Sequence, residues 1–102
     1  MKKKFAYILM GNHYNPDEHK AVFETDNQIT YIFTVKNLNE AIIKAKKLKE
    51  EKIGIIELCG AFGEEGANRI IEATDNEIGI GYVVNKEEQE PIFSSFFSKS
   101  LK

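Results

Sequence analysis

Four short runs of apolar residues predict the strands of a small sheet. Residues 5–10 and 53–58 are almost continuously apolar, and residues 78–84 form a similar run that includes two glycines. Unbroken apolar runs of this length are typical of strands that are covered on both faces. Residues 29–35, which are rich in β-branched and aromatic side chains, predict a fourth strand.

Two stretches between these strands repeat their apolar residues at the spacing of a helix. In residues 37–52 the repeat follows Asn37 and Glu40, which resemble a capping box with asparagine in place of serine or threonine. The apolar positions of this helix are Leu38, Ala41, Ile42, Ala45 and Leu48. A second, shorter helix is predicted to end at Asp75 and Asn76. Its inward stripe consists of Ala67, Ile70, Ile71 and Thr74.

The order of these elements defines the predicted fold. Strand, helix, strand, helix and strand alternate across residues 29–84, which implies parallel strands joined by right-handed crossovers. We therefore expect an α/β fold with a mainly parallel sheet of about four to five strands, flanked by two to three helices, in a Rossmann-like or flavodoxin-like order. Residues 20–35 are expected to add an antiparallel hairpin that turns at Asp26 and Asn27, with a short helical turn before the strand as the alternative.

The end of the chain carries an aromatic stripe that predicts a final helix, with Pro91 near its start. The stripe consists of Ile92, Phe93, Phe96, Phe97 and Ser100. In one interpretation it covers the remaining open face of the sheet. In the other it is buried against a second subunit, which would make the protein a homodimer.

The composition is that of one globular domain. The chain has 102 residues, of which 42% are hydrophobic and 29% are charged, which is enough for one core but not for two. A single α/β domain is therefore expected over residues 1–102. The net charge of −2 leaves no basic surplus to attract nucleic acid or an anionic membrane, so neither is an expected partner.

The first residues are interpreted as a strand behind a lysine cluster rather than as a secretion signal. The apolar run at residues 5–10 is shorter than the core of a signal peptide and ends in the polar residues Asn12 and His13. No window of the sequence approaches the roughly 18 apolar residues of a membrane helix. The single cysteine excludes a disulfide within the chain. We therefore expect a cytoplasmic protein.

Polar residues follow three of the predicted strands, where a ligand site would form. The carboxyl ends of parallel strands lie at one edge of a sheet, and the loops that leave them make the usual ligand crevice. If the first strand runs parallel to the others, this edge gathers Gly11, Asn12 and His13, then Cys59 and Gly60, and then Asn85 and Lys86.

Glu57 and Cys59 carry most of the chemistry near this edge. They are two residues apart, so in a strand both side chains point to the same face. A carboxylate in a buried strand is costly unless it is paired or its pKa shifts. Glu57 is therefore a candidate general base or a ligand-binding acid, and a structural carboxylate bonded to loop amides is the alternative.

Cys59 and His13 are weaker candidates for catalysis. Cys59 lies just ahead of a helix N-terminus, where the helix dipole favours a thiolate nucleophile. Acidic residues nearby in the sequence oppose that role, and cysteine is often a small buried side chain. His13 is a candidate acid or base, and it could activate Cys59 only if the strand order brings the two residues together.

The glycines Gly60, Gly63 and Gly66 suggest a phosphate-binding turn, because a glycine-rich turn that enters a helix offers free amides. Their spacing matches neither common nucleotide-binding motif. Glu64 and Glu65 occupy the expected first helical turn and would repel a phosphate. A tight turn with close helix packing is therefore the favoured interpretation.

The segment of residues 11–19 offers His13, Asp17, Glu18 and His19 as candidate metal ligands. A separation of six residues between the histidines matches no common zinc arrangement, and Asn15 and Pro16 favour a turn. A polar surface loop is the favoured interpretation, so we expect neither a metal nor a cofactor.

Four segments carry a resemblance to a known family. In order along the chain, FAYILMG, AVFETDNQITYIFTV, IELCGAFG and GYVV are similar to a family of small uncharacterised bacterial and archaeal proteins of about this length, classed as a domain of unknown function. IELCGAFG is the most distinctive of these segments. The resemblance implies no activity, substrate, cofactor or catalytic residue.

The leading hypothesis is a cytosolic, dimeric α/β domain that binds a small polar molecule at the carboxyl edge of its sheet. The expected site includes Glu57, His13 and Cys59 as candidate catalytic residues, and its candidate ligand-binding residues are Asn12, Gly60, Gly63 and Asn85. The first alternative is a small isomerase, lyase or hydrolase that uses Glu57 or His13 for proton transfer. The second is an interaction module that dimerises through the aromatic helix.

Overall fold

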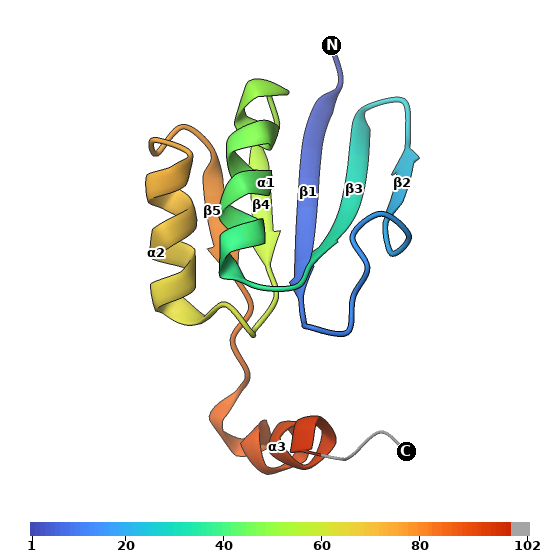
Figure 1. Cartoon of the computed structure of the whole chain (residues 1–102). Coiled ribbons are helices and arrows are strands. Elements are labelled where there is room, and N and C mark those ends of the chain that lie inside the picture. The colour runs from blue at the N-terminus through green and yellow to red at the C-terminus, as the bar shows by residue number, and fades with distance from the viewer. Residues whose placement is uncertain (99–102) are drawn as a thin grey trace.

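The computed structural model describes residues 1–98, which form a five-stranded sheet with three α-helices (Figure 1). The strands are β1 (Lys3–Met10), β2 (Ala21–Glu24), β3 (Gln28–Val35), β4 (Ile55–Leu58) and β5 (Gly79–Tyr82). The helices are α1 (Leu38–Glu50), α2 (Gly63–Ala73) and α3 (Glu90–Ser98), and a short 3-10 helix, η1 (Glu87–Gln89), precedes α3. The predicted α/β class is confirmed.

The strands lie in the order β2-β3-β1-β4-β5. β1 is parallel to both β3 and β4, and β4 is parallel to β5, whereas β2 is antiparallel to β3. The parallel strands therefore follow the flavodoxin-like order. The hairpin is confirmed, with the Thr25 N–H donating to the Gln28 carbonyl over 2.9 Å across the turn. This hairpin and a loop join β1 to β3, where a doubly wound fold has a crossover helix.

Local sequence explains how α1 begins. The Oδ1 atom of Asn37 accepts a hydrogen bond of 2.9 Å from the Glu40 N–H, as a helix N-cap does. The Glu40 carboxylate in turn accepts from the Lys36 N–H over 2.7 Å. The predicted cap is confirmed, and the predicted inward positions Ala41, Ala45 and Leu48 are buried.

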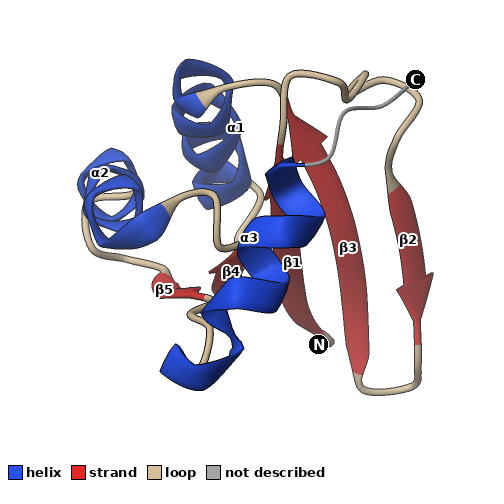
Figure 2. Ribbon diagram, turned by 90° about the horizontal axis from the view of Figure 1, so that it is seen from below, coloured by secondary structure: helices blue, strands red, loops and turns tan. Residues whose placement is uncertain are grey.

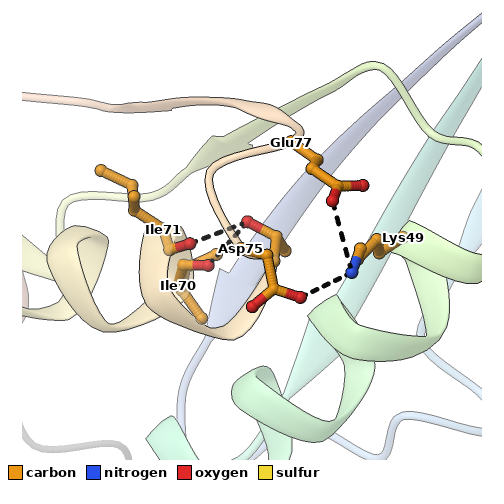
Figure 3. Close-up of polar contacts among 6 residues, drawn as sticks. Lys49, Ile70, Ile71, Asp75 and Glu77 are labelled. Atoms are coloured by element: carbon orange, nitrogen blue, oxygen red, sulfur yellow. Dashed lines mark hydrogen bonds and ion pairs between the residues drawn. The ribbon is translucent and has the colours of Figure 1, made fainter.

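The end of α2 is tied to the end of α1 (Figure 3). Asp75 and Asn76 adopt positive φ angles of 55° and 58°, which confirms them as the helix stop. The Asp75 carboxylate accepts a hydrogen bond of 2.6 Å from the Lys49 Nζ, which lies 3.8 Å from Glu77. This bond lowers the pKa of Asp75 and raises that of Lys49. Because Asp75 and Glu77 are exposed and Lys49 is partly exposed, the cluster positions the two helix ends more than it stabilises the fold.

One face of the sheet, covered by α1 and α2, holds the hydrophobic core (Figure 2). Alternate strand residues point toward these helices, so that Ala6 and Ile8 of β1 and Ile56 and Leu58 of β4 are fully buried. The alanines of α1 let its backbone approach the sheet closely. The buried hydrophobic cluster consists of Ala6, Ile8, Val35, Ala41, Ala45, Leu48, Ile53, Ile56, Leu58, Phe62, Ala67, Ile70 and Ile78.

The opposite face, here called the open face, carries no helix within residues 1–98 (Figure 2). By strand register its large apolar residues are Phe5, Tyr7, Leu9, Phe23, Ile32 and Ile55. Ile55 is 40% exposed and Phe23 is 57% exposed. The expectation that the apolar runs at residues 5–10 and 53–58 are covered on both faces is therefore wrong, because the β1–β3 connection brings no helix to this side.

The final helix does not cover the open face either. α3 lies across the carboxyl edge of the sheet (Figures 1 and 2), and none of its residues is buried. Phe96 is 67% exposed and Phe97 is 75% exposed, so the first interpretation of the aromatic stripe is wrong for this chain. Ser100, the last residue predicted for the stripe, lies outside the described residues.

Candidate functional site

The segments that follow β1, β4 and β5 meet at the carboxyl edge of the sheet. The Met10 N–H donates to the Cys59 Sγ over 3.3 Å, and the Cys59 N–H donates to the Ile8 carbonyl over 3.1 Å. The Val83 N–H donates to the Leu58 carbonyl over 2.9 Å. The parallel direction of β1, which the sequence left undetermined, therefore brings these three segments side by side.

The loops at this edge leave the sheet on opposite sides. β3 and β4 lead into α1 and α2, which lie on the face of the sheet opposite the open face. The loop after β1 passes over the open face, where its His19 carbonyl accepts a hydrogen bond of 2.7 Å from the Thr34 hydroxyl. β1 and β4 therefore flank a topological switch point, the place where open α/β sheets bind their ligands.

A cavity of about 840 Å³ lies at this switch point, between the strand ends and α3. Cys59, Gly60 and Gly63 contribute to its wall from the β4–α2 segment, and Asn85 contributes from the segment after β5. Aromatic rings supply much of the remaining wall, namely those of Tyr7, Tyr14, Tyr82, Phe93, Phe96 and Phe97.

The polar groups of the cavity favour hydrogen bonding over charge pairing. Burial raises the pKa of Tyr7, with smaller contributions from Cys59, Glu57 and Tyr14, so this phenol stays protonated at neutral pH. The Asn85 side-chain amide donates to the Glu90 carboxylate over 2.9 Å. Among the described residues, no lysine or arginine lines the cavity.

Glu57 lies beside this cavity rather than in its wall. Its strand register places it between Tyr7 and Gly81 on the open face, where it is half-buried. A Cβ atom at Gly81 would lie 2.9 Å from its Oε1, so the missing side chain of Gly81 makes room for the carboxylate. The expectation of a carboxylate in a buried strand is wrong on this face, because no helix covers it within residues 1–98.

Asn12 and His13 lie in the loop after β1, but they do not line the cavity. Both are exposed, and the His13 ring packs against Tyr14 with 4.2 Å between ring centroids. The catalytic roles considered for Glu57, His13 and Cys59 stay predictions. Sequence reasoning missed Tyr7, in the middle of β1, and Tyr14, in the loop that follows it, because their place in the wall depends on where α3 lies.

The glycines after β4 have structural roles. Gly63 adopts a φ of 64°, which allows the turn that enters α2. A Cβ atom at Gly66 would lie 3.2 Å from the Cβ of Phe62, so this glycine permits close packing inside the first turns of the helix. Glu64 and Glu65 occupy the first turn, as predicted, and they place negative charge where a phosphate would bind.

Within residues 1–98, no three histidine, cysteine, aspartate or glutamate side chains gather closely enough to hold a metal ion. His19 instead organises its own loop, because its Nδ1 accepts a hydrogen bond of 2.8 Å from the Asn15 N–H. The same part of the chain contains no helix long and apolar enough to cross a membrane.

Comparison with known proteins places the chain in a family. A family model described as "Family of unknown function (DUF6506)" matches residues 3–98. The chain belongs to this family. No curated protein and no solved structure matches it.

The DUF6506 match agrees with the resemblance to a domain of unknown function. The matched residues run from β1 to the last described residue of α3, so they include every element that lines the cavity. The cavity is therefore part of the DUF6506 domain itself and not of an extension to it.

Proposed function

We propose that this domain binds a small, uncharged molecule that combines a flat apolar part with polar groups. The observation that carries the proposal is the cavity of about 840 Å³ at the switch point between β1 and β4. Its volume falls within the range of roughly 300–1,000 Å³ that ligand pockets occupy. The sequence predicts a small polar ligand, and the proposal adds that this ligand also has an apolar part.

The wall chemistry supports this class of ligand. Aromatic rings from β1, β5 and α3 offer flat apolar surface, on which planar groups stack. The protonated phenol of Tyr7 can donate a hydrogen bond to a carbonyl or hydroxyl oxygen of the ligand. An anion would meet the Glu90 carboxylate and would find no lysine or arginine among the described residues of the wall.

Binding is favoured here over the proton-transfer alternative. A general acid or base has to reach the reacting group of the substrate within about 3 Å or through one water. Glu57 and His13 do not line the cavity, whereas Cys59 does. The proposal therefore assigns no reaction, and it keeps the cytoplasm as the expected location because the chain contains one cysteine and no disulfide.

The test uses N-phenyl-1-naphthylamine, an uncharged diaryl amine whose fluorescence rises in apolar surroundings. We expect saturable binding to the wild-type chain. Ala61→Phe should weaken binding at least tenfold, because Ala61 is exposed at the cavity wall and a phenyl group there would fill part of the space. The matched control is Asn68→Phe, an exposed position of α2 outside the cavity wall, which should leave binding unchanged.

Alkylation of Cys59 provides a second readout of the same site. Since Cys59 lines the cavity and is the only cysteine, bound probe should slow its reaction with iodoacetamide. Equal probe binding by the wild-type and Ala61→Phe chains, together with an unchanged alkylation rate, would show that the probe binds elsewhere and would refute the proposal.

A further inference from the structure

Exposed apolar side chains lie both on the open face of the sheet and on α3. On the sheet, Phe23 and Ile55 are 57% and 40% exposed. On the helix, Ile92, Phe96 and Phe97 are 64%, 67% and 75% exposed. Figure 2 shows α3 crossing the carboxyl edge beside this face, so that the helix and the sheet can meet the same partner.

The size of this surface is that of a subunit interface. A fully exposed phenylalanine presents about 200 Å², so Phe23, Phe93, Phe96 and Phe97 together expose roughly 480 Å², of which the surface that faces the cavity is a part. A stable interface buries about 800 Å² of each partner. Four side chains thus supply a large share of that area, and the half-buried residues Phe5, Leu9 and Ile32 add to it.

The cavity is also incomplete in a single copy. Ligand pockets typically enclose 70–90% of the surface of a bound molecule. Phe96 and Phe97 belong to the wall of this cavity, yet most of each side chain is exposed to solvent. α3 makes its main contacts with η1 and has no buried residue, so the wall that it supplies is not packed onto the sheet and leaves the cavity open to solvent.

We propose that a second copy of this chain covers the open face and α3, and that it thereby closes the cavity of the first copy. This inference rests on the proposed ligand-binding function. A two-fold arrangement uses the same surface on both chains, so each copy covers the cavity of the other.

The composition of the surface favours a second copy over an unrelated transient partner. Permanent homodimer interfaces are more apolar than transient ones, and their centres are depleted in charged residues. Among the strand residues that face the open side by register, the charged ones are Lys3, at the amino end of β1, and Glu57. The remaining residues of this face are apolar, aromatic, glycine, threonine or glutamine.

β2 offers a matched pair of variants to test this arrangement. Phe23 faces the open side and is 57% exposed, whereas Val22 faces the other side of the same strand and is 61% exposed. Lysine is well tolerated on edge strands such as β2. Phe23→Lys should therefore place a charge in the subunit interface without disturbing the core, and Val22→Lys should add the same charge outside the interface.

Sedimentation velocity of the full chain over a range of concentrations, with circular dichroism as the check on folding, provides the first measurement. We expect the wild-type and Val22→Lys chains to be dimers and the folded Phe23→Lys chain to be a monomer. If Phe23→Lys does not fold, Phe97→Lys replaces it in sedimentation, because α3 has no buried residue.

Titration with N-phenyl-1-naphthylamine provides the second measurement. Phe23 does not line the cavity, yet Phe23→Lys should weaken probe binding at least tenfold, because the monomer leaves the cavity uncovered. Phe97 itself lines the cavity, so Phe97→Lys cannot be used in this titration. In that case the probe affinity of the wild-type chain is compared at protein concentrations above and below the dissociation constant of the dimer.

Two results would overturn the inference and leave the proposed function intact. The first is a wild-type chain that stays monomeric at every concentration while the Ala61→Phe effect on probe binding persists. The second is a monomeric Phe23→Lys chain with unchanged probe affinity, which would show that no second copy is needed to close the cavity. A wild-type dimer that binds no probe would instead refute the proposed function. The proposal that a second copy closes the cavity, which rests on that function, would then be refuted too.

Discussion

Ile55 and Ile56 are neighbours in β4 whose side chains point to opposite faces of the sheet. Truncating each of them tests how differently the two faces are covered. Ile56 is fully buried beneath the helices, whereas Ile55 is 40% exposed on the open face. The same substitution to alanine at both positions removes the same atoms from the same strand. Any difference in the free energy of unfolding therefore reports burial and packing rather than chemistry.

The expected magnitudes follow from this burial. Ile56→Ala should cost about 3.5 kcal/mol, because substitutions of this kind in a closed core lose both transfer free energy and packing around a cavity. The methylene groups that Ile55→Ala removes are worth about 2.4 kcal/mol when fully buried. With 40% of the side chain already in water, about three fifths of that value, or roughly 1.4 kcal/mol, should be lost. No cavity term is added because the site is open to solvent.

Urea denaturation followed by circular dichroism is the assay, with both changes made in the Phe23→Lys chain so that association of copies does not contribute. A domain of this size with a denaturant slope near 1.5 kcal/mol per molar should show midpoints about 1.4 M apart. Costs that agree within about 0.5 kcal/mol would mean that both faces are equally covered in one chain. That result would refute the one-sided packing described for this sheet.

Two further predictions concern single hydrogen-bonding groups. Asn37→Ala should destabilise the chain by about 1 kcal/mol in a thermal or urea melt, because Asn37 caps α1. The control is Asn39→Ala, at an exposed position of the same helix, which should change the free energy of unfolding by less than half of that. Burial raises the pKa of Tyr7 above its unfolded value near 10, so the native state holds the phenolic proton more tightly than the unfolded chain does. The stability that this difference contributes is complete below about pH 10. It is lost as the pH rises through the native pKa. Tyr7→Phe should therefore flatten the alkaline loss of stability and remove the last step of the tyrosinate absorbance titration, and an unchanged alkaline profile would contradict the assignment.

The helices and their ends follow from local chemistry, which is why sequence reasoning found them. Asn37 binds an amide only three residues away, and Asp75 and Asn76 tolerate the left-handed backbone that stops α2. The apolar spacing of α1 depends on the geometry of one helix alone. These features involve neighbours within one or two helical turns, so the order of residues is sufficient to predict them.

The faces of the sheet could not be predicted in the same way. An apolar run such as residues 5–10 is equally compatible with burial by helices of its own chain and with burial by another molecule. The apolar neighbours of Glu57 predict a carboxylate in a buried strand, but it lies half-buried on the face that carries no helix within residues 1–98. Burial of a strand residue depends on what crosses over the sheet, and that depends on connections far away in the sequence.

The cavity shows the same division between short-range and long-range information. The grouping of Cys59, Gly60 and Asn85 was predictable once parallel strands were assumed, because parallel strands bring their carboxyl ends to one edge. The participation of Tyr7 and Tyr14, and of the aromatic rings of α3, required the position of the final helix.

Residue order therefore specifies the elements, their caps, the hairpin and the edge at which a site can form, since each of these depends on spacing and backbone preference. The direction of β1, the absence of a helix on the open face within residues 1–98, and the position of α3 across the strand ends emerge from packing between distant segments. Those long-range contacts place the apolar stripe of α3 in a cavity wall, because the burial of a side chain depends on all the segments packed around it and not on its own segment alone.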